Sequence, residues 1–137
     1  MTVSDFVEPV ITDVNRGFWE GAAAGELRSQ LCDNGHLRLP PAPWCPFCLS
    51  DDWHWEVLSG RGTVLSRLIF HQAYFPAWQD RLPYNVVLVQ LEEGPRMISN
   101  IVPLSFQDFA VGDELEVVFE AEGDLVIPRF QIVDAGL

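Results

Sequence analysis

The sequence predicts a mainly β chain in three parts: a short N-terminal helix, a small cysteine-rich ribbon and a five-stranded barrel. Two observations carry this prediction. All three cysteines lie between positions 32 and 48, in two turn-like segments. From about position 60 onward, β-rich runs alternate with turn signals, and no long helical pattern intervenes. The expected parts are residues 1–25 for the arm and helix, 26–58 for the ribbon and 59–137 for the barrel.

The composition is that of a globular chain with a strongly acidic balance. Its 137 residues, 48% of them hydrophobic, suffice for one modest domain with a core. Twenty acidic residues face eight basic ones, all arginine, and the formal net charge is -12. Since phosphate binding needs clustered lysine and arginine, nucleic acid is not an expected partner. Neither a signal-peptide pattern nor an apolar run of membrane-spanning length is visible, so we expect a cytoplasmic protein without membrane contact.

The N-terminal part contains one amphipathic segment, expected to be helical over residues 15–24. Gly25 is a plausible stop for this helix. Phe18 and Trp19 form an aromatic pair on adjoining faces. Two interpretations stay open at this point: the helix packs on its own chain, or it presents the aromatic pair to a partner.

The cysteine-rich segment has the spacing of a metal site. Cys45 and Cys48 form a C-x-x-C turn, which supplies two thiolates and therefore half of a tetrahedral zinc site. The other half must come from an upstream turn, where Cys32 and His36 have the right chemistry. Gly35 stands where most ribbons have a second cysteine, and His36 follows one residue later. We expect a structural zinc held by Cys32, His36, Cys45 and Cys48.

Other interpretations of the cysteines remain. Water or a carboxylate could replace His36, or the site could have lost a ligand. A redox C-x-x-C pair needs a helix that begins at the first cysteine, and four nearby prolines argue against one. A disulfide would leave one of three cysteines over, and nothing points to an oxidising compartment.

The second half of the chain predicts a small closed barrel of the OB type. Its five expected strands cover residues 63–71, 84–91, 96–102, 114–120 and 126–133. The second of these is apolar on both faces and is therefore expected in the centre. Five short strands without a long helix suit an OB-fold.

The loop after the first barrel strand is long and aromatic. It contains His71, Tyr74, Phe75 and Trp78. The loop either folds onto its own barrel or faces a partner or an acyl ligand, and we favour the second interpretation because exposed aromatic patches mark interaction sites. His71 is not favoured as a general base. No serine elbow, phosphate-cradling glycine loop or His-Glu metal motif appears in the sequence.

Several motifs together resemble a known family. They are Phe18-Trp19-Glu20, the prolines before the second cysteine turn, Ser59-Gly60-x-Gly62-Thr63-Val64, Pro83-Tyr84, Val89-x-Leu91-x-Glu93-Gly94-Pro95-Arg96, Asn100-Ile101-Val102, Val111-Gly112-Asp113 and Pro128-x-Phe130. Their order and spacing resemble the zinc-ribbon plus OB-fold accessory proteins of thiolases, thiolase-like acyltransferases and aldolases. This family was formerly described as a domain of unknown function. The resemblance covers about residues 14–131, and Gly35 is its one departure.

The resemblance implies a subunit that is not catalytic by itself. Such subunits shape or cover the acyl-CoA site of a thiolase-like partner, which carries the catalytic residues, and they stabilise a heterotetramer. The partner or acyl-CoA contacts would then include Phe18, Trp19, His71, Tyr74, Phe75 and Trp78. The competing interpretation is a stand-alone OB-fold protein that binds acyl-CoA or another small molecule.

Overall fold

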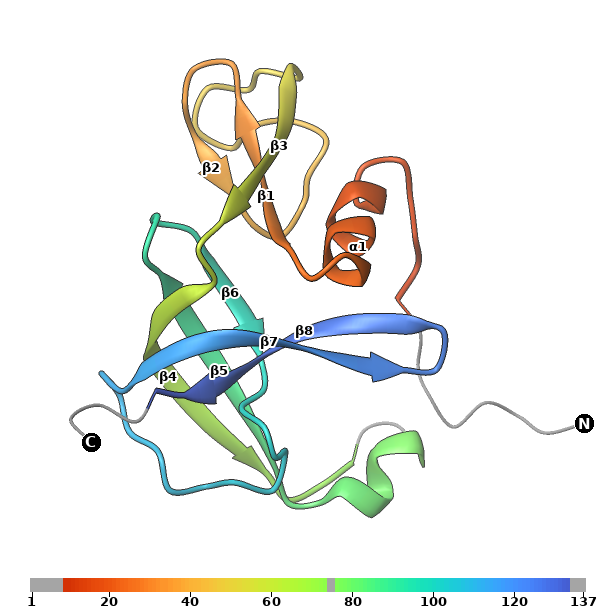
Figure 1. Cartoon of the computed structure of the whole chain (residues 1–137), viewed down its shortest axis with the longest axis vertical. Helices are drawn as coiled ribbons and strands as arrows, with labels where there is room; N and C mark the ends of the chain where they lie inside the picture. The colour runs from red at the N-terminus through yellow and green to blue at the C-terminus, as the bar shows by residue number, and fades with distance from the viewer. Residues whose placement is uncertain (1–8, 74–75, 134–137) are drawn as a thin grey trace, which may run out of the picture.

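The computed structural model describes residues 9–73 and 76–133, and it has the expected order of parts (Figure 1). A short helix is followed by a three-stranded sheet and then by a five-stranded sheet. The elements are α1 (Arg16–Ala23), β1 (Leu27–Cys32), β2 (Leu37–Arg38), β3 (Trp53–Leu58), β4 (Arg61–Phe70), η1 (Pro76–Arg81), β5 (Tyr84–Leu91), β6 (Arg96–Ser99), β7 (Glu114–Glu122) and β8 (Leu125–Ile132). The prediction of a mainly β chain is confirmed. No helix in these described ranges is long and apolar enough to cross a membrane.

The small sheet is antiparallel, in the order β2-β1-β3. Its interior is partly polar. Gln30 on β1 is fully buried, and its Oε1 accepts hydrogen bonds from Arg38 Nε at 2.6 Å and from Ala42 N at 2.9 Å. These bonds tie β1, β2 and the proline-rich connection together, where a lobe this small has few apolar side chains to bury.

The large sheet, in the order β6-β5-β4-β7-β8, curls into a half-barrel. β4 is the central strand, whereas β5, which was expected in the centre, lies between β6 and β4 and largely alternates between buried and half-buried residues. Just beyond the end of β6, the chain meets β8 at one parallel bridge between Ile101 and Phe130, both fully buried. The apolar core lies inside this curl and extends to Leu27 and Leu58 of the small sheet.

The third barrel strand is shorter than the sequence predicts. It was expected over residues 96–102, but β6 ends at Ser99. Beyond Ser99 the regular pairing with the β5 backbone ends. Ile101 N–H donates instead to the buried side chain of Asn85 on β5, at 2.7 Å. Ile101 then pairs with Phe130 of β8, so the chain changes partner there.

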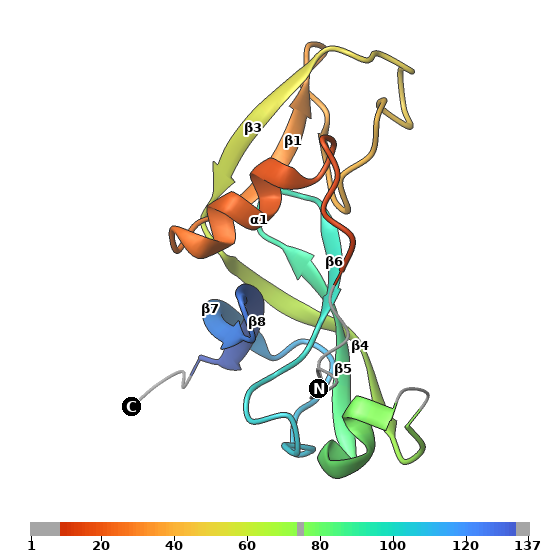
Figure 2. The ribbon, with the colours of Figure 1, turned by 90° about the vertical axis from the view of Figure 1, so that its right-hand side faces the viewer.

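The helix α1 packs on its own chain. It lies where the two sheets meet, against β1 and β8 (Figure 2). A Cβ atom at Gly17 would overlap the Trp55 ring, so the helix approaches the small sheet as closely as glycine allows. Ala22 is buried, and Phe18 packs against the core cluster. Of the two interpretations of the helix, the structure supports packing on the chain itself.

Candidate functional site

The four expected metal ligands come together at the end of the small sheet. One ligand atom from each of Cys32, His36, Cys45 and Cys48 lies within 4.8 Å of all the others. Cys32 Sγ is 3.8 Å from Cys48 Sγ. His36 Nδ1 is 3.3 Å from Cys32 Sγ and 3.5 Å from Cys45 Sγ.

These distances fit a tetrahedral zinc ion. At zinc–sulfur bonds of about 2.3 Å, two thiolates in a tetrahedron lie about 3.8 Å apart, and a thiolate and an imidazole nitrogen lie about 3.6 Å apart. The donor set of three thiols and one imidazole is also one that structural zinc uses. A zinc ion held by all four side chains would have no open position for a substrate, as in a structural site.

The first ligand turn explains how a histidine one residue late can reach the cluster. Cys32 N–H donates to His36 C=O at 2.9 Å, and Gly35 N–H donates to Cys32 C=O at 3.0 Å. Gly35 has φ +86°, a backbone conformation that favours glycine. The turn thus brings residue 36 back beside Cys32, and the imidazole, longer than a thiol, spans the remaining distance.

The cysteines differ in their local electrostatics. Hydrogen bonding from the Asn34 side chain, followed by the Ser50 backbone, lowers the pKa of Cys48 to about 6. Burial raises the pKa of Cys32 above its usual value, because a charged thiolate is disfavoured away from water. Asn34 and Ser50 both flank the ligand turns, so the loops that place the thiols also favour the thiolate form of Cys48.

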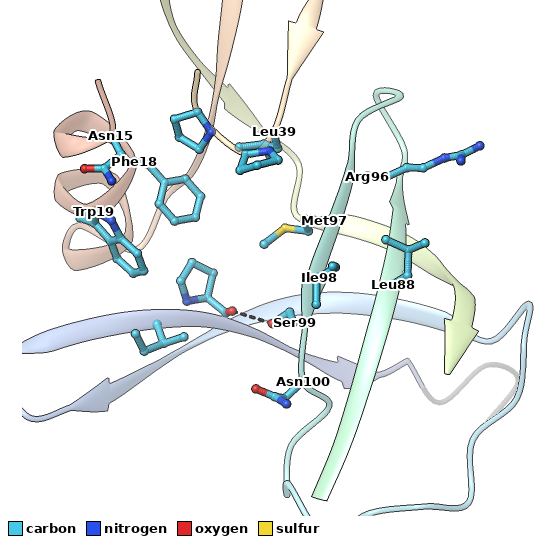
Figure 3. Close-up of a pocket in the computed structure, with 14 residues that line it drawn as sticks. Asn15, Phe18, Trp19, Leu39, Leu88, Arg96, Met97, Ile98, Ser99 and Asn100 are labelled. Carbon is cyan, nitrogen blue, oxygen red and sulfur yellow. Dashed lines mark hydrogen bonds between the residues drawn. The ribbon is translucent and has the colours of Figure 1, made fainter. Parts of the chain in front are cut away.

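A second feature is an apolar pocket between the two sheets, with a volume of about 600 Å³ (Figure 3). Phe18 and Trp19 of α1 line one side, and Met97 of β6 faces them across the pocket. Pro40 and Pro41 close it from the ribbon side. Arg96 borders the pocket, but its side chain is directed away from it (Figure 3).

The pocket exists because the half-barrel does not close along its whole edge. Leu91 N–H donates to Pro95 C=O at 2.9 Å, so these two residues form a hydrogen-bonded pair of the β5–β6 ladder. Hydrogen-bonded and non-hydrogen-bonded pairs alternate along an antiparallel ladder, and Ile98 therefore falls in a non-hydrogen-bonded pair. Its backbone N–H and C=O point away from β5. Further along this edge, Phe130 N–H donates to Asn100 C=O at 2.9 Å. The edge of β6 therefore faces β8, and the backbone hydrogen bonds to β8 described here lie around Phe130, just beyond the end of β6.

Pro128 ends this pairing. Two residues before Phe130, a parallel ladder would place a backbone N–H that donates to Ile98 C=O. Proline has no N–H, and its carbonyl oxygen instead accepts a hydrogen bond from Ser99 Oγ at 2.8 Å. The strands separate at Pro128, and the pocket lies in the gap, which we call the seam.

The expected contact residues fall into three groups. Phe18 and Trp19 line the pocket, with their rings edge to face at 5.0 Å. Trp78 lies on η1 with its ring 4.8 Å from Tyr84, so this part of the aromatic loop folds onto the barrel. His71 is exposed at the end of β4. Tyr74 and Phe75 lie outside the described residues.

The structure also shows residues that the sequence analysis missed. Trp44, Phe47 and Leu49 are large apolar residues around the second ligand turn, and all three are exposed. Their signal in the sequence was three apolar residues interleaved with Cys45 and Cys48, in a turn too small to bury them.

Comparison with known proteins agrees with this architecture. Two family models match consecutive parts of the chain: "ChsH2, rubredoxin-like zinc ribbon domain" over residues 19–54 and "ChsH2, C-terminal OB-fold domain" over residues 55–120. Among solved structures, a chain of the Ltp2-ChsH2(DUF35) aldolase is similar at 34% identity with a TM-score of 0.79. That match covers 91% of this chain and 98% of that one.

Two curated relatives are longer than the chain. A probable enoyl-CoA hydratase alpha subunit of Thermomonospora curvata is 34% identical over 125 residues, which are 90% of this chain and 39% of the relative. A DUF35 domain-containing scaffold protein of Pyrococcus furiosus is 34% identical over 87 residues, which are 64% of this chain and 63% of the relative. The matched part of the chain thus spans about two fifths of the length of the first relative and about three fifths of the length of the second. The ribbon, the OB-fold and the family matches together show that the chain belongs to the DUF35 family, in which a ChsH2-type zinc ribbon precedes an OB-fold domain.

Proposed function

We propose that this chain is the non-catalytic accessory subunit of an enzyme complex that acts on acyl-CoA thioesters, and that its catalytic partner is thiolase-like. The partner would cleave or form a carbon–carbon bond or transfer the acyl group. The observation that carries the proposal is the similarity to the Ltp2-ChsH2(DUF35) aldolase, which extends over nearly the whole of that chain. The similarity to a protein named as a hydratase alpha subunit supports the same role.

The chemistry of the chain supports a role without catalysis. All three thiols, the strongest nucleophiles available, lie in the ligand cluster, and so does the imidazole of His36. We propose Cys32, His36, Cys45 and Cys48 as the ligands of the zinc. Zinc bound there would contribute folding energy to a lobe with little apolar core. The nucleophile and the bases would then belong to the partner.

The apolar pocket is our candidate for the part of the chain that shapes or covers the acyl-CoA site. Phe18, Trp19 and Met97 offer an apolar lining suited to an acyl chain. His71 and Trp78, at the far end of β4 and on η1, remain proposed partner contacts. A heterotetramer around a partner dimer and a cytoplasmic location are also part of the proposal.

The test is recovery of the complex from the native cell. The tagged chain is purified from extract, retained proteins are identified by mass spectrometry, and zinc is measured in the same eluate. We expect a thiolase-like protein in a fixed ratio and about one zinc per chain. The purified partner should turn over acyl-CoA faster with the chain than without it. A clean monomer with no companion would refute the proposal.

The pocket also favours a second candidate, a stand-alone acyl-CoA binder. Titration calorimetry of the isolated chain with short- and long-chain acyl-CoA separates the two. Binding that strengthens with acyl length and is lost in Trp19→Ala, without any recovered partner, would favour the stand-alone protein. The accessory-subunit proposal expects tight acyl-CoA binding only in the complex.

A further inference from the structure

The most exposed apolar side chains of the ribbon surround its second ligand turn. Trp44 is 57% exposed, Phe47 73% and Leu49 74%. The turn that carries them is held firmly: Leu49 N–H donates to Cys45 C=O at 2.8 Å, and Cys45 N–H donates to Ser50 C=O at 2.9 Å. We call Trp44, Phe47 and Leu49 the knuckle tip. Figure 2 shows the ligand loops at the end of the small sheet farthest from the large sheet.

Leu49 has an unusual backbone for its residue type. Its φ is +61°, and it is the one non-glycine residue with positive φ in the part of the chain that the structure describes. Side chains other than glycine, asparagine and aspartate rarely adopt this conformation, because it brings Cβ close to the backbone. A leucine here costs stability, and its exposed side chain recovers little of that cost by burial within the chain. Backbone strain of this kind is typical of sites where the side chain has a function.

The charges around the knuckle tip have one sign. Asp33, Asp51 and Asp52 are exposed beside it, and none of them forms an ion pair among the described residues. They adjoin the turn directly, because Asp33 accepts a hydrogen bond from Ser50 Oγ at 2.5 Å and its N–H donates to Asp52 C=O at 3.1 Å.

The two arginines of the ribbon are already engaged elsewhere. Arg28 pairs with Glu26 at 2.7 Å, and Arg38 is buried against Gln30 and the Ala42 carbonyl. The knuckle tip is therefore an apolar patch with an uncompensated acidic rim. An apolar centre with a charged rim is the anatomy of a protein–protein contact, in which large apolar side chains act as anchors and rim charges steer association.

We propose that the knuckle tip is a docking anchor that inserts into an apolar cleft rimmed by lysine and arginine on the catalytic partner subunit. This inference rests on the proposed accessory function and names the surface that performs it. The rim requires a basic protein surface, because carboxylates repel the phosphates of nucleic acids, membranes and coenzyme A. The contact is separate from the apolar pocket of the seam.

Leu49→Gly gives the sharpest test, because it should preserve or raise the stability of the chain while lowering its affinity for the partner. Glycine relieves the backbone strain, so urea unfolding should show a chain as stable as wild type or more stable, with unchanged zinc content. Its affinity for the purified catalytic subunit recovered with the wild-type chain should nevertheless fall at least tenfold. Phe47→Ser should weaken binding similarly. Leu68→Ser is the matched control, since Leu68 is a 58% exposed leucine on β4.

The rim is tested by salt. Binding of the wild-type chain should weaken as salt rises, and Asp51→Asn with Asp52→Asn should reduce that dependence. If Leu49→Gly and Phe47→Ser bind as wild type does, or if Leu68→Ser weakens binding equally, the docking inference is wrong while the accessory role stands. If the wild-type chain recovers no catalytic subunit, both fail together.

Discussion

At the scale of single residues, Asn85 organises a connection that has little regular structure. Its Nδ2 donates to the carbonyl oxygens of Ile101 at 2.8 Å, Leu104 at 3.0 Å and Phe106 at 2.9 Å. Its Oδ1 accepts from Ile101 N–H at 2.7 Å. Asn85 is fully buried, so its amide depends on these protein groups for its hydrogen bonds. One amide thus holds the segment that begins at the bridge with β8 and leads toward β7.

Asn85→Asp should be strongly destabilising in a pH-dependent way. A carboxylate would face several carbonyl oxygens in a buried site, at a cost of about 3–5 kcal/mol at neutral pH. The folded-state pKa of this carboxyl would rise above its unfolded value of about 3.9, so the loss of stability is small near pH 4 and grows as pH rises. Urea unfolding of the variant and of wild type at about pH 5 and about pH 7.5 measures this loss, which should be larger at the higher pH. The exposed Gln107→Glu is the control, and equal stability of the two variants would contradict the prediction.

His36 is the residue on which the proposed metal site depends most directly. His36→Ala should leave three thiolates, which bind zinc more weakly and release it to a chelator at least tenfold faster. Zinc release followed with a colorimetric chelator gives the rate. His54→Ala is the matched control, because His54 is an exposed histidine of the same sheet, with its Nε2 3.8 Å from a Glu56 oxygen. Identical release rates would mean that the imidazole is not a ligand.

At the scale of elements, η1 is attached to the β7–β8 hairpin by one carboxylate. Both Glu122 oxygens accept hydrogen bonds from Arg81, at 2.7 and 2.9 Å. The buried Arg129 donates to the same carboxylate at 2.9 Å. The guanidinium of Arg81 also lies over the Trp78 ring, 4.7 Å from its centroid. This network explains why the part of the aromatic loop around Trp78 folds inward.

Glu122→Gln should weaken that attachment at neutral pH. Hydrogen bonds from Arg81, together with Arg129, hold the pKa of Glu122 below its usual value of 4.5. Its contribution to stability is therefore present above pH 4.5 and is lost as pH falls through the lower folded-state pKa. We expect a loss of about 1–3 kcal/mol at neutral pH. The difference between the variant and wild type should shrink in acid.

Urea unfolding across this pH range measures the effect. Glu26→Gln is the control, because the Glu26–Arg28 pair is more exposed and should contribute less than about 1 kcal/mol. A Glu122→Gln variant whose deficit persists unchanged in acid would show that the carboxylate's charge is not the cause.

At the scale of the whole molecule, local sequence signals predicted the ribbon and the barrel strands. The contacts between these parts depend on residues far apart in the sequence. The spacing of Cys45 and Cys48 and the alternating runs of the barrel are visible within a few residues. The pocket is not visible in this way, because it forms only when Pro128 lies beside Ile98, thirty positions away in sequence. There the missing N–H of proline prevents backbone pairing between the two strands. The strain at Leu49 likewise follows from the folded turn, since leucine itself gives no sign of a positive φ.

The charge of the whole molecule separates it from the OB-folds that bind oligonucleotides. Such domains bind single strands through a positively charged groove and stacked aromatic side chains. This chain has the OB-fold and exposed aromatic residues, but its net charge is -12 and it contains no lysine. Two of its eight arginines, Arg38 and Arg129, are buried. Electrostatic repulsion should therefore outweigh stacking.

We expect no binding of the isolated chain to single-stranded DNA or RNA, even at about 50 mM salt, where phosphate contacts are strong. Fluorescence anisotropy of a labelled oligothymidine and a labelled oligouridine tests this, with a known single-strand-binding OB protein as the positive control. Binding that weakens as salt increases would contradict the prediction, because that dependence reports cations released from phosphates by lysine or arginine. It would mean that the exposed arginines form a groove strong enough to overcome the acidic surface. The acidic rim of the knuckle tip would then no longer be a guide to a basic protein partner.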